Sequence, residues 1–115
     1  MATITIWHNP RCSKSRAALA ILQERGVTPV EIKYLETPPS KADIVKTLAA
    51  LNMEAKDIVR KGEAVYKTLK LSAESSNDEI LDALVDNPIL IERPIIISGD
   101  QAVIGRPPEN VTSLL

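Results

Sequence analysis

The apolar residues at the start of the chain follow the pattern of a strand, a helix and a second strand. The residues that carry it are Ile4 and Ile6, then Ala18, Leu19, Ile21 and Leu22, then Val30, Ile32 and Tyr34. The first and third groups alternate with polar residues, as in strands, whereas the second group recurs at helical spacing and ends before Gly26. A β-α-β unit places its two strands parallel with a right-handed crossover, so this segment predicts an α/β fold.

The last part of the chain predicts a β-hairpin and a short final helix. Residues 94–97 form a continuous apolar run, which is typical of a buried strand. Residues 98–100 read Ser-Gly-Asp and suit a tight turn, after which residues 102–104 can pair back. Pro107 or Pro108 suits the first turn of a terminal helix. Joined to the first unit, the hairpin predicts a mixed four-stranded sheet.

The segment between the two parts has helical periodicity. Helices are expected near residues 44–51, 54–60, 64–69 and 80–85, and candidate capping boxes pair Ser40 with Asp43 and Ser76 with Glu79. No flexible linker flanks this segment, so we interpret residues 37–88, approximately, as an insertion within one domain that covers residues 1–115. The order β-α-β, helical block, β-β-α predicts a thioredoxin-like fold with a helical insertion.

Composition restricts the class of protein. The chain has 115 residues, 44% of them hydrophobic, and a net charge of −1, which gives no global electrostatic reason to bind nucleic acid or a membrane surface. No apolar run approaches the roughly 20 residues of a membrane span, and no signal-peptide pattern follows Met1. Cys12 and His8 are the only residues of their types, so we expect no disulfide and no protein-built metal site. We expect a cytoplasmic protein and favour a monomer.

Cys12 lies where the first predicted strand gives way to the helix. A helix N-terminus carries partial positive charge and unpaired N–H groups, and His8 and the neighbouring basic side chains add cationic character. A mostly ionised thiol at neutral pH requires about 2.7 kcal/mol of preferential stabilisation. A helix terminus supplies only about 0.3–1 kcal/mol. We therefore expect a direct hydrogen bond to the sulfur from His8, Ser15 or a backbone N–H, and prefer this interpretation to an inert buried cysteine.

Three arginines lie at the ends of predicted elements, namely Arg60, Arg93 and Arg106. Guanidinium groups bind tetrahedral oxyanions through paired charged hydrogen bonds. Three of them together would neutralise a divalent oxyanion and allow a thiolate to approach it. On charge alone, Arg25 would serve as well. The bond between Arg93 and Pro94 opens a buried strand, which makes Pro94 a candidate cis-proline.

The run from Ile4 to Arg16 resembles the signature turn of the glutaredoxin-type arsenate reductase family. The similarity continues in order through residues 34–39, a segment ending at residues 60–61, and residues 87–95 and 105–108. It covers nearly the whole chain and resembles a short subgroup of the family. The resemblance implies a thioredoxin-like fold, Cys12 as nucleophile, Arg60, Arg93 and Arg106 as oxyanion ligands, His8 and Ser15 as supports for the thiolate, and a cis-proline at Pro94.

The resemblance also implies a reaction. Arsenate would dock among the arginines, and the Cys12 thiolate would attack arsenic and displace water or hydroxide. Glutathione would then attack, arsenic would leave in the trivalent state, and glutaredoxin would clear a mixed disulfide between Cys12 and glutathione. Glutathione is then a co-substrate and glutaredoxin a partner, with no bound cofactor. Because the chain has no second cysteine, the electrons must come from outside.

Two alternatives remain open. Residues 11–15 read Arg-Cys-Ser-Lys-Ser, where established reductases of the family usually carry Ala-Cys-Gly-Thr-Ser. The cations Arg11 and Lys14 would aid anion capture, or would mark a glutathionylated partner as the substrate of a monothiol, glutathione-dependent disulfide oxidoreductase. The other alternative is a non-enzymatic redox regulator that binds RNA polymerase. It is disfavoured because Ser15 stands where such sensors carry a second cysteine.

Overall fold

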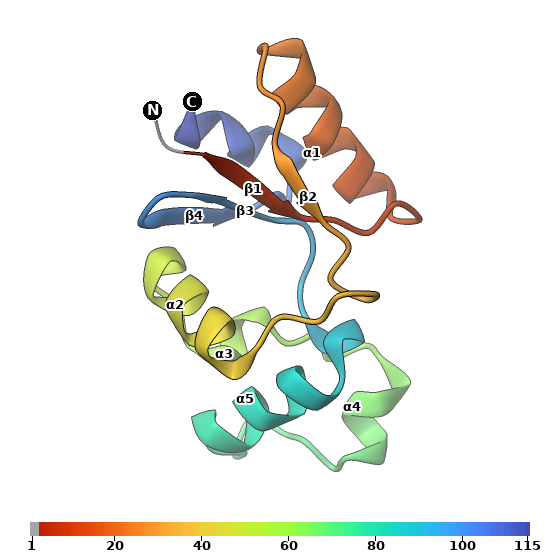
Figure 1. The fold of residues 1–115 in the computed structure, drawn as a ribbon. Helices are drawn as coiled ribbons and strands as arrows, with labels where there is room; N and C mark the ends of the chain where they lie inside the picture. The colour runs from red at the N-terminus through yellow and green to blue at the C-terminus, as the bar shows by residue number, and fades with distance from the viewer. Residues whose placement is uncertain (1–2) are drawn as a thin grey trace. The chain divides into compact units, whose positions relative to one another are not determined.

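The computed structural model describes residues 3–115, which fold as two compact units (Figure 1). The sheet unit comprises the chain up to Thr37 together with Arg93–Leu115, and the helical unit comprises Pro38–Glu92. The predicted insertion covers residues 37–88, approximately, and the helical unit covers Pro38–Glu92. The single-domain interpretation stays a prediction. No helix in the described residues has the length and apolar character of a membrane span.

The sheet unit contains a mixed four-stranded sheet, as predicted. Its strands are β1 (Ile4–Trp7), β2 (Val30–Ile32), β3 (Ile95–Ser98) and β4 (Gln101–Ile104), in the spatial order β2-β1-β3-β4. β1 and β2 run parallel, and β3 is antiparallel to both β1 and β4. The register places Ile96 opposite both Ile6 and Val103, so β1 and β3 are the central strands.

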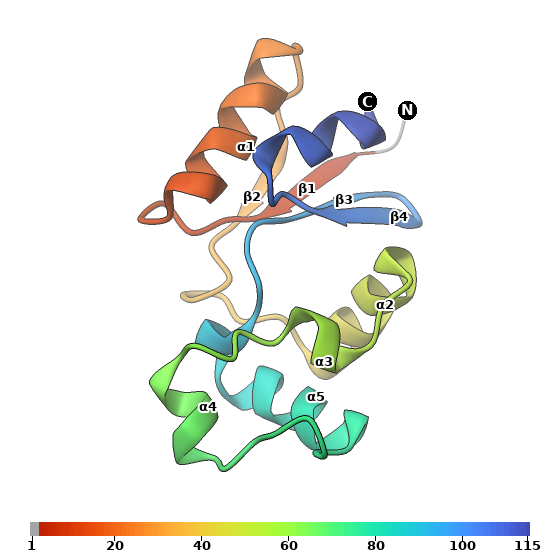
Figure 2. The ribbon, with the colours of Figure 1, turned by 180° about the vertical axis from the view of Figure 1, so that it is seen from behind.

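Two helical segments cover one face of this sheet. They are α1 (Ser13–Glu24) and the 3₁₀ helix η2 (Pro108–Leu114), which lie side by side in both views (Figures 1 and 2). Between them and the sheet lies a core of fully buried side chains, namely Ile6, Ala18, Leu22, Ile96 and Val111. The core holds β1 and α1 in a fixed relation, and the turn between them therefore has a defined geometry.

One predicted strand is shorter than expected. The alternation of Val30, Ile32 and Tyr34 predicted that all three lie in a strand, but β2 ends at Ile32. The N–H groups of Glu36 and Thr37 both bond to the carbonyl of Lys33, so the chain turns there. Tyr34 lies in that turn with its side chain fully buried. The alternation thus predicted the strand correctly at Val30 and Ile32 and wrongly at Tyr34, and of the three side chains only that of Tyr34 is fully buried, whereas Val30 is 50% exposed.

The helical unit contains α2 (Lys41–Leu51), α3 (Ala55–Ile58), α4 (Ala64–Thr68), α5 (Asn77–Asp86) and a 3₁₀ turn, η1 (Pro88–Leu90). Both predicted capping boxes are present, at Ser40 with Asp43 and at Ser76 with Glu79. The helix expected over residues 54–60 stops at Ile58. It stops because Val59 pairs with Ile91 in a β-bridge and the segments on either side exchange backbone hydrogen bonds.

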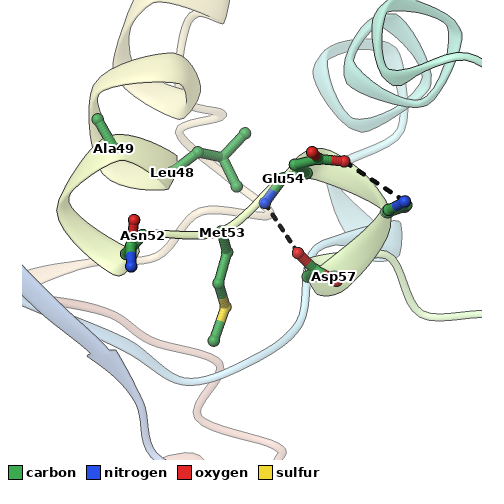
Figure 3. A pocket seen from close by; sticks show the side chains of 7 residues that line it. Leu48, Ala49, Asn52, Met53, Glu54 and Asp57 are labelled. Carbon is green, nitrogen blue, oxygen red and sulfur yellow. Dashed lines mark hydrogen bonds and ion pairs between the residues drawn. The ribbon is translucent and has the colours of Figure 1, made fainter.

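The helical unit also has a shallow pocket of about 420 Å³ (Figure 3). The side chains that line it are Leu48, Ala49, Asn52, Met53, Glu54, Lys56 and Asp57. Dashed lines in the figure mark the Asp57 carboxylate accepting from the Glu54 N–H at 2.9 Å and the ion pair between Glu54 and Lys56. None of the predicted site residues lines this pocket.

Candidate active site

Cys12 is the N-cap residue of α1, immediately after the turn that follows β1. Its backbone is extended, and its carbonyl accepts the N–H of Arg16 at 3.0 Å, the first bond of the helix. The thiol is free and only 9% exposed. The sulfur therefore lies over the ring of unpaired N–H groups at the helix start, as the sequence predicted.

Opposing effects act on the ionisation of Cys12, and those that favour the thiolate prevail. Burial raises the pKa of the thiol. The backbone N–H of Ser15, the side chain of Arg93 and the backbone N–H of Lys14 all donate to the sulfur and lower the pKa, and the charge of Arg93 lowers it further. The net direction is downward. The predicted direct hydrogen bond to the sulfur thus comes from the backbone, with Arg93 as an additional donor.

The lowered pKa predicts fast alkylation of Cys12 by iodoacetamide in mildly acidic solution, at about pH 6–7. Thiolate is present above the pKa of the folded protein, so the rate should fall only as the pH drops through that lowered value. The measurement is a pH profile of the alkylation rate, with the same protein unfolded in urea as control. Coincident midpoints for the folded and unfolded protein would contradict an activated thiol.

His8 and Ser15 form a buried hydrogen-bonded pair beside the cysteine turn. His8 Nδ1 lies 2.6 Å from Ser15 Oγ, which also accepts the backbone N–H of Asn9 at 3.0 Å. Burial lowers the pKa of His8, Glu31 raises it and Lys33 lowers it, with a net downward direction. The ring is therefore mostly neutral at neutral pH, and the expectation that His8 adds a cation near Cys12 is wrong because the side chain is desolvated. The pair can support the thiolate by fixing the backbone N–H of Ser15.

Asn9 closes the turn, a role that sequence reasoning missed. Its carbonyl accepts the N–H of Cys12 at 3.0 Å, and its side-chain Oδ1 accepts the N–H of Arg11 at 3.0 Å. Its own N–H donates to Ser15. The available signal was the Asn-Pro dipeptide, which is typical of turns in which an asparagine side chain bonds to the backbone two residues on.

Arg93 and Arg106 are both brought to Cys12 within the sheet unit. Arg93 donates to the sulfur directly, and Arg106 Nη2 lies 3.8 Å from Sγ. Arg106 Nε also donates to the carbonyl of Arg93 at 2.7 Å, which ties the two arginines together. The Arg93–Pro94 peptide bond is cis, the isomer for which the sequence made Pro94 a candidate, and the Arg106–Pro107 bond is cis as well.

Tyr34 is a second residue whose part in the site the sequence did not indicate. Its buried side chain forms a hydrogen bond with Arg93. Burial lowers the pKa of Arg93, but the bond to Cys12 and the interactions with Tyr34 raise it more. The guanidinium beside the sulfur is therefore charged throughout the physiological range.

The other two candidate arginines belong to different units. Arg25 is the C-cap residue of α1 and is separated from Cys12 by the length of that helix, about 18 Å. It takes no part in the site. Arg60 belongs to the helical unit, where its side chain is paired with Glu63 and Glu92. Its place among the oxyanion ligands stays a prediction.

The mixed sheet, with a cysteine at its strand-to-helix turn and two arginines beside that cysteine, defines a protein of thioredoxin-like architecture. The family model described as "ArsC family" matches residues 7–114, and the chain belongs to this family. The predicted resemblance is thereby confirmed.

The chain is similar to named members over its full length. It is 43% identical over 117 aligned positions to "Arsenate reductase" from Neisseria meningitidis serogroup A, covering 100% of both chains. It is 46% identical over 114 positions to "Uncharacterized protein YfgD" from Escherichia coli K12, covering 97% of this chain and 96% of that one. The solved structure of an arsenate reductase from Vibrio cholerae aligns with a TM-score of 0.94 at 42% identity, covering 99% of this chain and 98% of that one. This likeness confirms the predicted fold class.

Proposed function

We propose that this protein is an oxidoreductase that reduces arsenate with Cys12 as its nucleophile. One observation carries the proposal: a thiol with a lowered pKa lies in contact with two charged guanidinium groups. A thiolate alone repels an anion, whereas Arg93 and Arg106 supply the charge that lets a divalent oxyanion approach. The names of the relatives at 43% and 42% identity indicate which oxyanion this is.

The proposed reaction uses this arrangement. The Cys12 thiolate attacks arsenic, an As–S bond forms, and an As–O bond breaks as water or hydroxide leaves. The sulfur of glutathione then attacks the sulfur of Cys12. The As–S electron pair stays on arsenic, which departs in the trivalent state, and the two sulfurs, oxidised by two electrons in all, end as a mixed disulfide. Glutaredoxin removes the glutathione by thiol exchange, and Cys12 is free again.

External reductants are part of the proposal because Cys12 is the only cysteine in the sequence. No thiol of this chain can attack the mixed disulfide, so glutathione and glutaredoxin act as co-substrate and partner, and no bound cofactor is required. Such a cycle needs a reducing compartment, for which the cytoplasm is our proposal. Arg60 joins Arg93 and Arg106 as the third oxyanion ligand in this proposal.

A coupled assay tests the proposed function. With glutathione, glutaredoxin and glutathione reductase present, the protein is expected to support arsenate-dependent oxidation of NADPH. The Cys12→Ser variant, in which an alcohol replaces the thiol, is expected to show none above background. Equal rates for the two proteins would overturn the proposal. A protein that fails with arsenate but reduces a glutathione mixed disulfide would instead be the monothiol disulfide oxidoreductase.

A further inference from the structure

We propose that Glu63 and Glu92 form a carboxylate clamp that competes with the oxyanion for Arg60. This inference rests on the proposed function, in which Arg60 is an oxyanion ligand. The inference adds Glu63 and Glu92 as residues that set the affinity for the oxyanion. Neither residue belongs to the cysteine turn, and both are negatively charged, so neither would bind an anion itself.

The backbone of the helical unit builds the clamp. The Arg60 N–H donates to the Leu90 carbonyl at 2.7 Å, and the Glu92 N–H donates to the Ile58 carbonyl at 2.7 Å. These bonds, together with the bridge between Val59 and Ile91, lay the segments of Arg60 and Glu92 against each other. Glu63 is the N-cap residue of α4 and reaches Arg60 from three residues further along the chain.

Both carboxylates bind the guanidinium directly. Arg60 Nε donates to Glu63 Oε1 at 3.2 Å, and Arg60 Nη1 donates to Glu92 Oε1 at 3.0 Å. The three side chains are only 23–26% exposed, so water screens these pairs less than it screens the more exposed pair of Lys41 with Asp82, whose side chains are 54% and 63% exposed. Arg60 is therefore held in ion pairs.

Glu63 and Glu92 occupy hydrogen-bond donors of Arg60 that an oxyanion would also use. Nε carries a single hydrogen, so its bond to Glu63 also removes the Nε–Nη2 edge through which a guanidinium grips an oxyanion at two points. Arg60 can bind the oxyanion in this way only after Glu63 releases Nε.

The competition predicts that neutral clamp residues tighten oxyanion binding. We would titrate arsenate into the Cys12→Ser protein by calorimetry, because without the thiol only binding is measured. Glu63→Gln and Glu92→Gln keep the shape and hydrogen-bonding capacity of the side chains and should each lower the Kd for arsenate about two- to fivefold. Their combination should lower it further.

Matched controls separate the clamp from a general change in charge. Asp82→Asn removes one carboxylate from the exposed pair with Lys41, and its combination with Glu74→Gln removes two exposed carboxylates from the same unit. Neither control should change the Kd by as much as the clamp variants do. Thermal unfolding of every variant confirms that it is folded under the conditions of the titration.

The outcomes are distinguishable. If the clamp variants bind arsenate as before or more weakly while Arg60→Met weakens binding, Glu63 and Glu92 position Arg60 and the competition is overturned. If Arg60→Met leaves the Kd unchanged, Arg60 is no oxyanion ligand and the clamp is a structural ion-pair cluster. If the Cys12→Ser protein with no other change does not bind arsenate at all, it is the proposed function that fails.

Discussion

Replacing Arg93 with methionine is expected to lower kcat/KM for arsenate by at least about a hundredfold, the effect typical of removing one preorganised donor from a developing anion. Arg93 donates to the sulfur of Cys12 and brings a positive charge to it, and both effects lower the pKa of the thiol. In the proposed reaction it also helps to neutralise the oxyanion. Methionine fills similar space without donors or charge, so the loss should reflect electrostatics more than packing.

A second readout separates the two roles of Arg93. Burial raises the pKa of Cys12, whereas the Ser15 N–H, the Arg93 side chain and the Lys14 N–H lower it. Without Arg93 the pKa should rise, because its hydrogen bond and its charge both lower the pKa of Cys12. The ultraviolet absorbance of the thiolate, followed against pH, measures this rise. As the pH is raised, more of Cys12 in the variant becomes thiolate, so kcat/KM should recover in part. The loss of kcat/KM that remains at high pH then measures the role of Arg93 in oxyanion binding.

Arg25→Met provides the matched control for this prediction. Arg25 is exposed and lies at the opposite end of α1, and its substitution removes the same charge from the same helix. It should leave both kcat/KM and the Cys12 titration close to those of the parent protein. An Arg93→Met protein that keeps the parent rate and the parent titration would show that the contact with Cys12 has no chemical role.

Replacing Gly105 with alanine is expected to destabilise the fold by about 1–3 kcal/mol, which corresponds to a fall in Tm of roughly 4–15 °C. A Cβ at this position would lie 2.7 Å from Cγ of Pro94, 3.2 Å from Cδ1 of Ile96 and 3.4 Å from Cβ of Ala18. The nearest of these atoms belongs to a proline ring, which cannot rotate away. The strain should therefore spread into the backbone of β3 and β4.

The same substitution should also reduce activity. The Gly105 N–H donates to the Pro94 carbonyl at 2.9 Å, and Gly105 directly precedes Arg106. A shift of either partner would move both arginines relative to the cysteine. Gly62→Ala is the control, because a Cβ there meets no atom within 4 Å. Thermal unfolding and the coupled assay together check the prediction, and equal Tm values for the two variants would contradict the proposed close packing.

The sequence predicted most of the fold because its signals are local. Capping boxes, a Gly-Asp turn and the periods of strand and helix are read within a few residues, and they placed the sheet, α1 and the two long helices of the insertion. The errors arose where distant segments meet. Tyr34 has the alternation of a strand but lies in a turn, and the helix before Arg60 is cut short by pairing with residues some thirty positions later.

In the candidate site, too, the local features could be predicted from the sequence and the contacts between distant residues could not. The position of Cys12 at a helix start follows from local pattern, whereas places at element ends made Arg93 and Arg106 candidates and the family resemblance implied their role. The partners of these groups do not follow, because no spacing rule indicates that Arg106 bonds to the Arg93 carbonyl or that Asn9 closes the turn. The neutral state of His8 likewise depends on burial, which only the packed structure provides.

The contact between Cys12 and Arg106 joins residues 94 positions apart. Because a chain is made from its N-terminus, Cys12 is synthesised long before Arg106. A nascent chain that has not reached Arg106 therefore lacks one of the donors to the sulfur.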